Sequence, residues 1–280
     1  SAPSGAQAAP AAPTTNTVAS GVGKVPDHDA GNWINYGGSN AADHFTPAAQ
    51  ITPQNAGKLE KVWEFHTGDK EPPASEGIEY AFENTPLKVG DNLYVCTPSQ
   101  MVIDIDPSTG TQKWRFDPKV KKAALQNVYD ATCRGVAYWE APPGTPQCPR
   151  RIIYGTTDGR LLAVDADTGK PCTSFGDNGA ANLLQGIGDT IPGFFSANSA
   201  PTIVNDVVVL GHQVVDNQKL NAPSGVVRGW DALTGRMLWA WDMDRPDQSG
   251  PPPQGKTYSR STPNVWSMIA GDDKLGLVYL

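Results

Sequence analysis

The chain has 280 residues, of which 18% are charged, and a formal net charge of −7 at pH 7. A nucleic-acid-binding protein needs a basic face, so this charge balance argues against that class. No run of eighteen apolar residues occurs, so the sequence predicts no transmembrane helix. The 29 glycines and 25 prolines separate short apolar runs, a pattern typical of an all-β protein rich in turns.

The N-terminal segment differs in composition from the rest of the chain. Residues 1–26 are rich in Ala, Pro, Ser, Thr and Gly and contain no aromatic residue. Such a segment buries too little apolar surface to offset the entropy that is lost on ordering. We therefore expect residues 1–31 to form a flexible leader. Residues 32–280 are expected to form the folded domain, with its ordered part beginning near Trp33.

Short apolar runs joined by a tight turn dominate the next part of the chain. The runs are "NLYVC", "MVIDID" and "QKWRFD", between residues 92 and 117. Residues 107–110 predict a turn between the last two, because Pro107 fixes φ and Gly110 permits a positive φ. Asp106 is suited to accept hydrogen bonds from N–H groups of the turn. Trp114 starts the next strand and offers a large apolar surface with one N–H donor.

This turn belongs to a repeat in which Asp is followed by Gly four residues later and by Trp after four more. In a degenerate copy Thr173 stands where Trp is expected, and we expect Phe175 to substitute for it. The aspartates are separated by 59 and 66 residues, a period that fits a four-stranded blade. Repeated blades around an axis form a β-propeller, which we favour over a β-sandwich with accidental similarity. The copies are Asp106–Gly110–Trp114, Asp165–Gly169–Thr173 and Asp231–Gly235–Trp239.

The repeats account for about three and a half blades. The fragment "KLEKVWEF", which contains Trp63, is interpreted as the last strand of a blade whose other strands lie elsewhere. The final residues, "DKLGLVYL", alternate like a strand that is cut off at Leu280. Because a ring that does not close leaves open sheet edges, we expect this chain to be a portion of a longer polypeptide or to be completed by another chain.

Four cysteines are present, at positions 96, 133, 148 and 172. An even number suggests two disulfides, for which three pairings exist. Buried free thiols are the alternative, and a metal site is disfavoured because no C-x-x-C pair occurs.

Several stretches together resemble the pyrroloquinoline quinone (PQQ)-dependent dehydrogenases, most of all the membrane-bound branch typified by quinoprotein glucose dehydrogenase. They are "VYDATCRGVAYWE", "CPRRIIYGTTDGRLLAVDADTGK", "SGVVRGWDALTG" and "STPNVWS…DKLGLVYL", and the resemblance runs from Asn32 to Leu280. It implies an all-β fold, an eight-bladed β-propeller of four-stranded antiparallel blades, of which this chain supplies roughly the first half.

The resemblance also implies a cofactor site. Glu83 matches the acidic residue that hydrogen-bonds the quinone. Arg134 matches the arginine that points at the quinone oxygens, and its permanently charged fork of donors suits a quinone that becomes negative as it accepts hydride. Trp266 matches the tryptophan on which the flat cofactor lies, and Asn198 and Asn264 match smaller hydrogen-bonding residues. The alternatives are a solvent-facing Glu, an ion pair between blades and inter-blade packing of the indole.

The implied metal is Ca²⁺, with Asp216 as its acidic ligand. The ion would polarise the quinone carbonyl as a Lewis acid, whereas the alternative is an ordinary loop aspartate. The family's general base is an Asp that lies beyond Leu280, so we expect the isolated chain to be inactive.

Two departures from the family pattern bear on the substrate. Only one cysteine, Cys133, precedes Arg134, whereas the alcohol-dehydrogenase branch has an adjacent pair there. Asp130 stands where the glucose-dehydrogenase branch has a His near cofactor and substrate, so we assign Asp130 a catalytic or specificity role. A carboxylate at this position favours a polyol or cyclitol hydroxyl.

In the expected blade topology, Cys96 and Cys133 lie at the same end of the ring, and Cys148 and Cys172 begin two strands of one blade. This favours the pairs Cys96–Cys133 and Cys148–Cys172.

The resemblance implies oxidation of a sugar, cyclitol or polyol hydroxyl to a lactone or ketone, with electrons passed to ubiquinone. We expect a glucose dehydrogenase-like activity, with quinate or shikimate and sorbitol or glycerol as alternative substrates. A propeller that serves as a non-enzymatic scaffold is the alternative from another class. A nicotinamide cofactor is disfavoured because no glycine-rich phosphate loop follows a strand. The expected location is the periplasm, at the bacterial inner membrane, with the remainder of the propeller and a small membrane-anchor subunit as partners.

Overall fold

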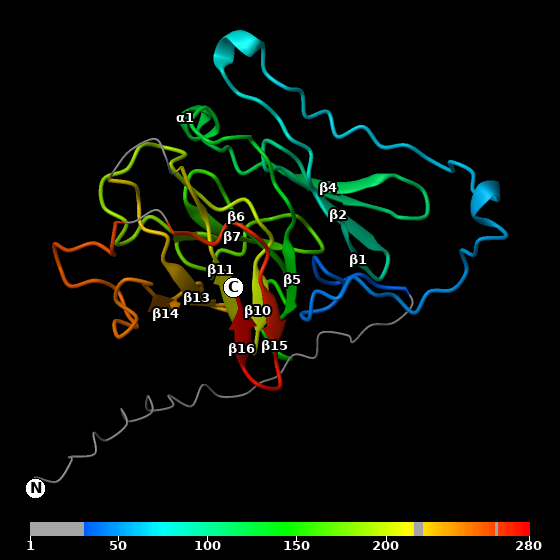
Figure 1. Cartoon of the computed structure of the whole chain (residues 1–280). Helices are drawn as coiled ribbons and strands as arrows, with labels where there is room; N and C mark the ends of the chain where they lie inside the picture. Colours follow the sequence, from blue (N-terminus) through cyan, green and yellow to red (C-terminus); the bar gives the residue numbers. More distant parts are fainter. Residues whose placement is uncertain (1–30, 216–220, 261–262) are drawn as a thin grey trace, which may run out of the picture.

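The structure, a computed structural model, describes residues 31–215, 221–260 and 263–280. These residues form three four-stranded antiparallel sheets and two two-stranded sheets. The four-stranded sheets lie side by side (Figure 1). The described part of the chain contains no helix with the length and apolar character that crossing a membrane requires. The expected leader, residues 1–31, lies outside the described residues except for Gly31, so that boundary stays a prediction.

Each four-stranded sheet is built largely from consecutive strands. The first has β1 (Leu87–Val89), β2 (Asn92–Cys96), β3 (Val102–Ile105) and β4 (Gln112–Phe116). The second has β5 (Ala137–Glu140), β6 (Arg150–Gly155), β7 (Arg160–Asp165) and β8 (Ala180–Asn182). The third has β10 (Thr202–Val204), β11 (Val207–Leu210), β13 (Val227–Asp231) and β14 (Met237–Trp241).

The remaining elements are short. β9 (Phe195–Ser196) pairs with β12 (Gln213–Val214), and β15 (Ala270–Asp272) pairs with β16 (Leu277–Tyr279). The helices are α1 (Lys122–Leu125) and two 3₁₀ turns, Ala56–Lys58 and Ala74–Glu76. Between β11 and β13 the chain leaves the third sheet, and β12 pairs with β9 in a two-stranded sheet that carries part of the candidate site.

The sheets pack face to face. Because successive residues of a strand point to opposite faces, one strand contributes side chains to the interfaces on both sides of its sheet. On β6, Ile152 belongs to the core cluster shared with the first sheet, whereas Ile153 belongs to the cluster shared with the third. On β11, Val208 faces the second sheet, and Val209 packs in a cluster with Ile269 just before β15. Sheets that are buried on both faces in this way are stacked like the blades of a propeller.

The aspartate of the repeat organises the turn, as the sequence predicted. The Asp106 carboxylate accepts from the N–H groups of Ser108 and Thr109, at 2.8 and 3.1 Å. The equivalent carboxylates, Asp165 and Asp231, accept from the N–H groups two and three residues later in the same way.

In the first two repeats, the aromatic residue packs on the glycine of the following repeat. A Cβ built on Gly169 would lie 2.5 Å from the indole of Trp114, whose N–H donates to the Ala166 carbonyl at 3.0 Å. Phe175 packs in the same way on Gly235, with 3.0 Å between its ring and the Cβ position. The expected substitution of Phe175 for the missing tryptophan is therefore confirmed, and the motif locks neighbouring sheets together.

Trp63 makes the same contact from a segment without regular structure. Its indole covers Gly110, and its N–H donates to the Pro107 carbonyl at 3.0 Å. Residues 59–73 are part of a long excursion outside the sheets (Figure 1) and have no strand partner among the described residues. That this fragment is the last strand of another blade stays a prediction.

Two disulfides use all four cysteines. Cys96 on β2 is bonded to Cys133, which precedes β5, and Cys148 is bonded to Cys172; the Cα atoms are 5.8 Å apart in both pairs. This is the pairing that the sequence analysis favoured. The first bond ties the first sheet to the segment that leads into the second.

Asp104 of β3 is buried, and one of its carboxylate oxygens has no hydrogen-bond partner in the described structure. Removal from water raises its pKa from 3.8 to about 7. The folded state therefore holds this proton more tightly than the unfolded state, so the free energy of unfolding falls as pH rises from about 4 to about 7 and stays low above.

We expect Asp104→Asn to unfold at higher urea concentration than the wild type at pH 8, by about 1–2 kcal/mol, and to lose this advantage at pH 5. Urea denaturation at the two pH values measures the difference. An equal difference at both pH values would contradict the titration of Asp104.

Candidate functional site

Two extended segments lie side by side and bring the candidate residues Glu83 and Arg134 together. Tyr80 and Ala131 form a parallel bridge, and the Thr85 N–H donates to the Arg134 carbonyl at 3.1 Å. The Cys96–Cys133 disulfide holds the second segment one residue before Arg134. The site is therefore fixed by backbone hydrogen bonds and a covalent bond rather than by a free loop.

The side chains of Glu83 and Arg134 form an ion pair, with Arg134 Nε 2.9 Å from Glu83 Oε2. The Thr132 hydroxyl donates to the same oxygen at 3.4 Å. Arg134 is 18% exposed and Glu83 44%. Arg134 Nη1 is buried and has no hydrogen-bond partner within the described structure. Because such an orphaned donor costs about 1–3 kcal/mol, it points to an acceptor that a ligand supplies.

An exposed indole lies against this guanidinium. The Cζ atom of Arg134 is 5.3 Å from the ring centroid of Trp266, whose side chain is 53% exposed. Both belong to a pocket of about 290 Å³. An indole surface beside a fixed cation suits a flat ring that carries acceptor oxygen atoms. The pocket is lined by Tyr129, Arg134, Gln213, Val214, Asn264 and Trp266.

Asn198 supports the pocket from behind. Its backbone carbonyl accepts from the Arg134 N–H at 2.8 Å, and its Nδ2 donates to Gln213 Oε1 at 3.3 Å. Asn198 Oδ1 is buried and, among the described residues, has no hydrogen-bond partner. The pairing of β12 with β9 places Gln213 beside Asn198. Asn198 and Arg134 thus each have one buried polar atom without a hydrogen-bond partner in the described structure.

His212 is structural rather than part of the pocket. It is buried against Phe195, with 3.8 Å between the ring centroids, and its Nε2 is 2.8 Å from the Ser224 carbonyl. Burial, and secondarily the charge of Arg228, lowers its pKa to about 3. The ring is therefore neutral near pH 7, and Nε2 carries the proton that is donated to Ser224.

The structure groups some of the predicted residues and separates others. Arg134, Asn264 and Trp266 line one pocket, and Glu83 and Asn198 contact Arg134. Asp130 instead lines a second pocket, with Glu71, Glu79 and Tyr80 among its walls, so its role beside the cofactor stays a prediction. Asp216 lies outside the described residues. The described residues contain no group of three or more His, Cys, Asp or Glu side chains that are placed to hold a metal ion.

Besides Val214, two pocket residues with polar side chains, Tyr129 and Gln213, were not predicted. Tyr129 immediately precedes Asp130, and Gln213 stands three residues before Asp216. Both are single residues in short or irregular segments, where no periodic pattern marks the side that faces a pocket. Their closeness in sequence to predicted residues is the one signal that the chain offers.

The comparisons with known proteins bear on the family to which this chain belongs. The family described as PQQ, "Glucose/ethanol/alcohol dehydrogenase, beta-propeller domain", matches residues 33–280. The glycerol dehydrogenase large subunit of Gluconobacter oxydans (strain 621H) is 45% identical over 254 residues, which are 90% of this chain and 34% of that protein. Quinoprotein glucose dehydrogenase A of Acinetobacter calcoaceticus is 39% identical, over 91% of this chain and 33% of that protein.

The quinate/shikimate dehydrogenase (quinone) of Acinetobacter baylyi is 36% identical, with 89% of this chain and 32% of that protein covered. The chain thus spans about a third of the length of these curated relatives. Among solved structures, the quinohemoprotein alcohol dehydrogenase ADHIIG of Pseudomonas putida HK5 superposes with a TM-score of 0.65 at 24% identity, over 89% of this chain and 34% of that one. This likeness supports the fold alone.

The predicted β-propeller is thereby confirmed, whereas the number of blades in the complete ring stays a prediction. Family match and relatives point to one conclusion: this chain belongs to the PQQ-dependent glucose, ethanol and alcohol dehydrogenase family, as part of its β-propeller domain.

Proposed function

We propose that the protein containing this chain is a PQQ- and Ca²⁺-dependent dehydrogenase that oxidises a hydroxyl group of a polyol, cyclitol or sugar to a ketone or lactone. The observation that carries the proposal is the buried Nη1 of Arg134, which has no hydrogen-bond partner among the residues that the structure describes, on a guanidinium stacked against the exposed indole of Trp266. A scaffold protein has no need for a cation held in this way over an open aromatic surface.

The donor set fits the cofactor. Trp266 offers a face for a planar ring system, Arg134 offers a free N–H, and Asn198 offers an amide oxygen that accepts a hydrogen bond. Asn264 lines the same pocket. When bound, PQQ supplies an electrophilic quinone carbon that accepts hydride, and Ca²⁺ supplies a Lewis acid that polarises the quinone. Asp216 is the proposed ligand of the cation.

The residues of this chain prepare the site electrostatically. Glu83 holds Arg134 through Nε, and Nη1 keeps no hydrogen-bond partner within the described residues. A guanidinium stays protonated at any working pH. Its charge is therefore in place before negative charge develops, and no reorganisation is needed during the reaction. The Trp266 indole gives the pocket an apolar wall.

Among the substrate classes, a polyol is favoured over glucose. The glycerol dehydrogenase relative is 45% identical, against 39% for the glucose dehydrogenase and 36% for the quinate/shikimate dehydrogenase. Asp130, in place of the histidine of the glucose branch, supports the same choice, because a carboxylate accepts hydrogen bonds from several hydroxyls. We propose further that ubiquinone accepts the electrons. The proposed location is the periplasmic face of the inner membrane, with a small membrane-anchor subunit as partner.

The full-length protein, reconstituted with PQQ and Ca²⁺, tests the proposal. We expect it to reduce a dye acceptor with glycerol and sorbitol at higher kcat/KM than with glucose, quinate or shikimate. The isolated 280-residue chain is the control and is expected to give no turnover. If the full-length protein neither binds PQQ nor reduces the dye with any of these substrates, the enzymatic proposal is overturned in favour of a scaffold.

A further inference from the structure

A glutamine in the turn between β2 and β3 is completely buried. Gln100 is 0% exposed, and its φ of 67° lies in the left-handed region that non-glycine residues rarely adopt. Its backbone is held on both sides: the N–H donates to the Thr97 carbonyl at 2.7 Å, and the Tyr154 hydroxyl donates to the Gln100 carbonyl at 3.2 Å. These two hydrogen bonds fix the backbone of Gln100, and therefore the direction in which its side chain leaves the turn.

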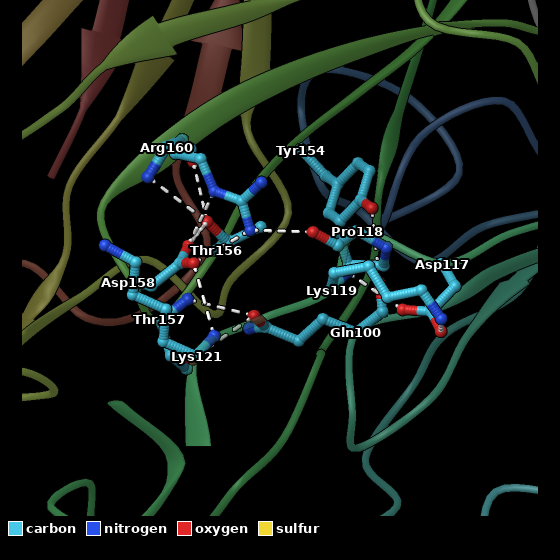
Figure 2. Close-up of polar contacts among 10 residues, drawn as sticks. All are labelled: Gln100, Asp117, Pro118, Lys119, Lys121, Tyr154, Thr156, Thr157, Asp158 and Arg160. Carbon is cyan, nitrogen blue, oxygen red and sulfur yellow. Dashed lines mark hydrogen bonds and ion pairs between the residues drawn. The ribbon is translucent and has the colours of Figure 1, made fainter. Parts of the chain in front are cut away.

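The hydrogen bonds define how the amide of Gln100 is oriented. The Thr157 N–H can only donate, and it lies 2.9 Å from Gln100 Oε1 (Figure 2). The Thr157 hydroxyl is 3.3 Å from the same oxygen. The NH₂ group therefore faces the other way, where Nε2 donates to the Thr132 carbonyl at 3.4 Å. Gln100 thus bridges the β6–β7 turn and the segment that precedes Arg134.

The β6–β7 turn is a rigid anchor for this bridge. Arg160 donates from Nε and Nη2 to the two carboxylate oxygens of Asp158, at 2.9 and 2.8 Å. The Thr156 hydroxyl donates to Asp158 at 2.6 Å. Arg160 Nη2 also donates to the Pro118 carbonyl at 2.9 Å, which fastens the turn to the chain between the first two sheets (Figure 2).

The other end of the bridge leads to the candidate site. Thr132 is completely buried, its hydroxyl donates to Glu83 Oε2, and the same oxygen accepts from Arg134 Nε. We infer that Gln100 is a positioning residue: it fixes the Thr132–Arg134 segment, and through it the direction in which the Glu83–Arg134 pair presents its free N–H to the cofactor pocket. This inference rests on the proposed function.

Gln100→Glu in the full-length apoprotein tests the inference through pH. A protonated carboxyl is isosteric with the amide and still donates a hydrogen bond to the Thr132 carbonyl. A carboxylate has no proton to donate, so its oxygen and the carbonyl oxygen, both acceptors, would repel each other. Burial raises the pKa of such a carboxyl. The charged groups of the neighbouring segments are the same in wild type and variant. They are Asp69, which accepts from Ser99, Asp158 and Arg160 in and beside the β6–β7 turn, and Glu83, which accepts from Thr132.

The readout is the Kd for PQQ, from quenching of tryptophan fluorescence. We expect the ratio of variant to wild-type Kd to be near one at pH 5.5 and on the order of tenfold at pH 8, as for other residues that orient a ligand. Gln100→Met, which lacks both hydrogen bonds, is expected to weaken binding equally at both pH values. Gln100→Met also tests the inference if the Gln100→Glu protein fails to fold.

Ile152→Ala is the stability control, because Ile152 is buried in the second sheet and makes none of these hydrogen bonds. It should lower the unfolding midpoint and leave the Kd unchanged. A Gln100→Glu protein that binds PQQ like the wild type at pH 8, or an Ile152→Ala protein that loses affinity equally, overturns the inference alone. A wild type that binds no PQQ overturns the proposed function together with it.

Discussion

Arg134→Lys in the full-length protein is expected to lower kcat/KM about a hundredfold or more. Lysine keeps the positive charge but replaces a planar fork by a single ammonium group. Arg134 uses Nε to hold Glu83 and keeps the buried Nη1 without a partner in the described structure. An ammonium group that pairs with Glu83 cannot also present a donor in the direction of Nη1. Steady-state dye reduction and the Kd for PQQ measure the loss.

Arg150→Lys is the matched control for this substitution. Arg150 also pairs with a carboxylate, that of Asp167, but Arg150 is half-exposed on the second sheet and does not line the pocket that contains Arg134. Exposed ion pairs contribute about 0–1 kcal/mol, so kcat/KM should stay within twofold of the wild type. A similar small effect of Arg134→Lys would mean that charge alone, and not the direction of the fork, is what the pocket requires.

The repeat was predictable from the sequence because it is local. Asp106 and Gly110 lie within one turn, and both the hydrogen bonds and the positive φ that the residue types favour are present. The contact between Trp114 and Gly169 was not predicted. It joins one repeat to the next across two sheets, and spacing along the chain does not specify which surfaces meet in space.

The candidate site was predicted only through the family resemblance. Glu83 and Arg134 are 51 residues apart in sequence, and they meet because two extended segments pair through backbone hydrogen bonds that any residue types can make. Gln100 left no signal for the same reason. A buried glutamine in a polar turn has no period, and its partners Thr132 and Thr157 come from two other parts of the chain.

Gly169→Ala is expected to destabilise the fold by about 2–4 kcal/mol. Two costs add at this position. A φ of +69° is strained for any residue with a Cβ, at about 1 kcal/mol or more. The new methyl group would also lie 2.5 Å from the Trp114 indole, and overpacking of this kind costs about 1–3 kcal/mol. The indole cannot simply move away, because its N–H is bonded to the Ala166 carbonyl.

Gly90→Ala separates these two costs. Gly90 has a φ of +55°, but no heavy atom lies within 4 Å of its Cβ position, so only the backbone strain of about 1 kcal/mol remains. Urea denaturation of the two variants and the wild type measures both losses. If Gly169→Ala costs no more than Gly90→Ala, the contact between indole and glycine does not hold the sheets together. A larger cost at Gly169 would show why a chain of stacked sheets needs the same Asp–Gly–aromatic spacing at every interface: the small residue and the ring are two halves of one contact, each on a different sheet.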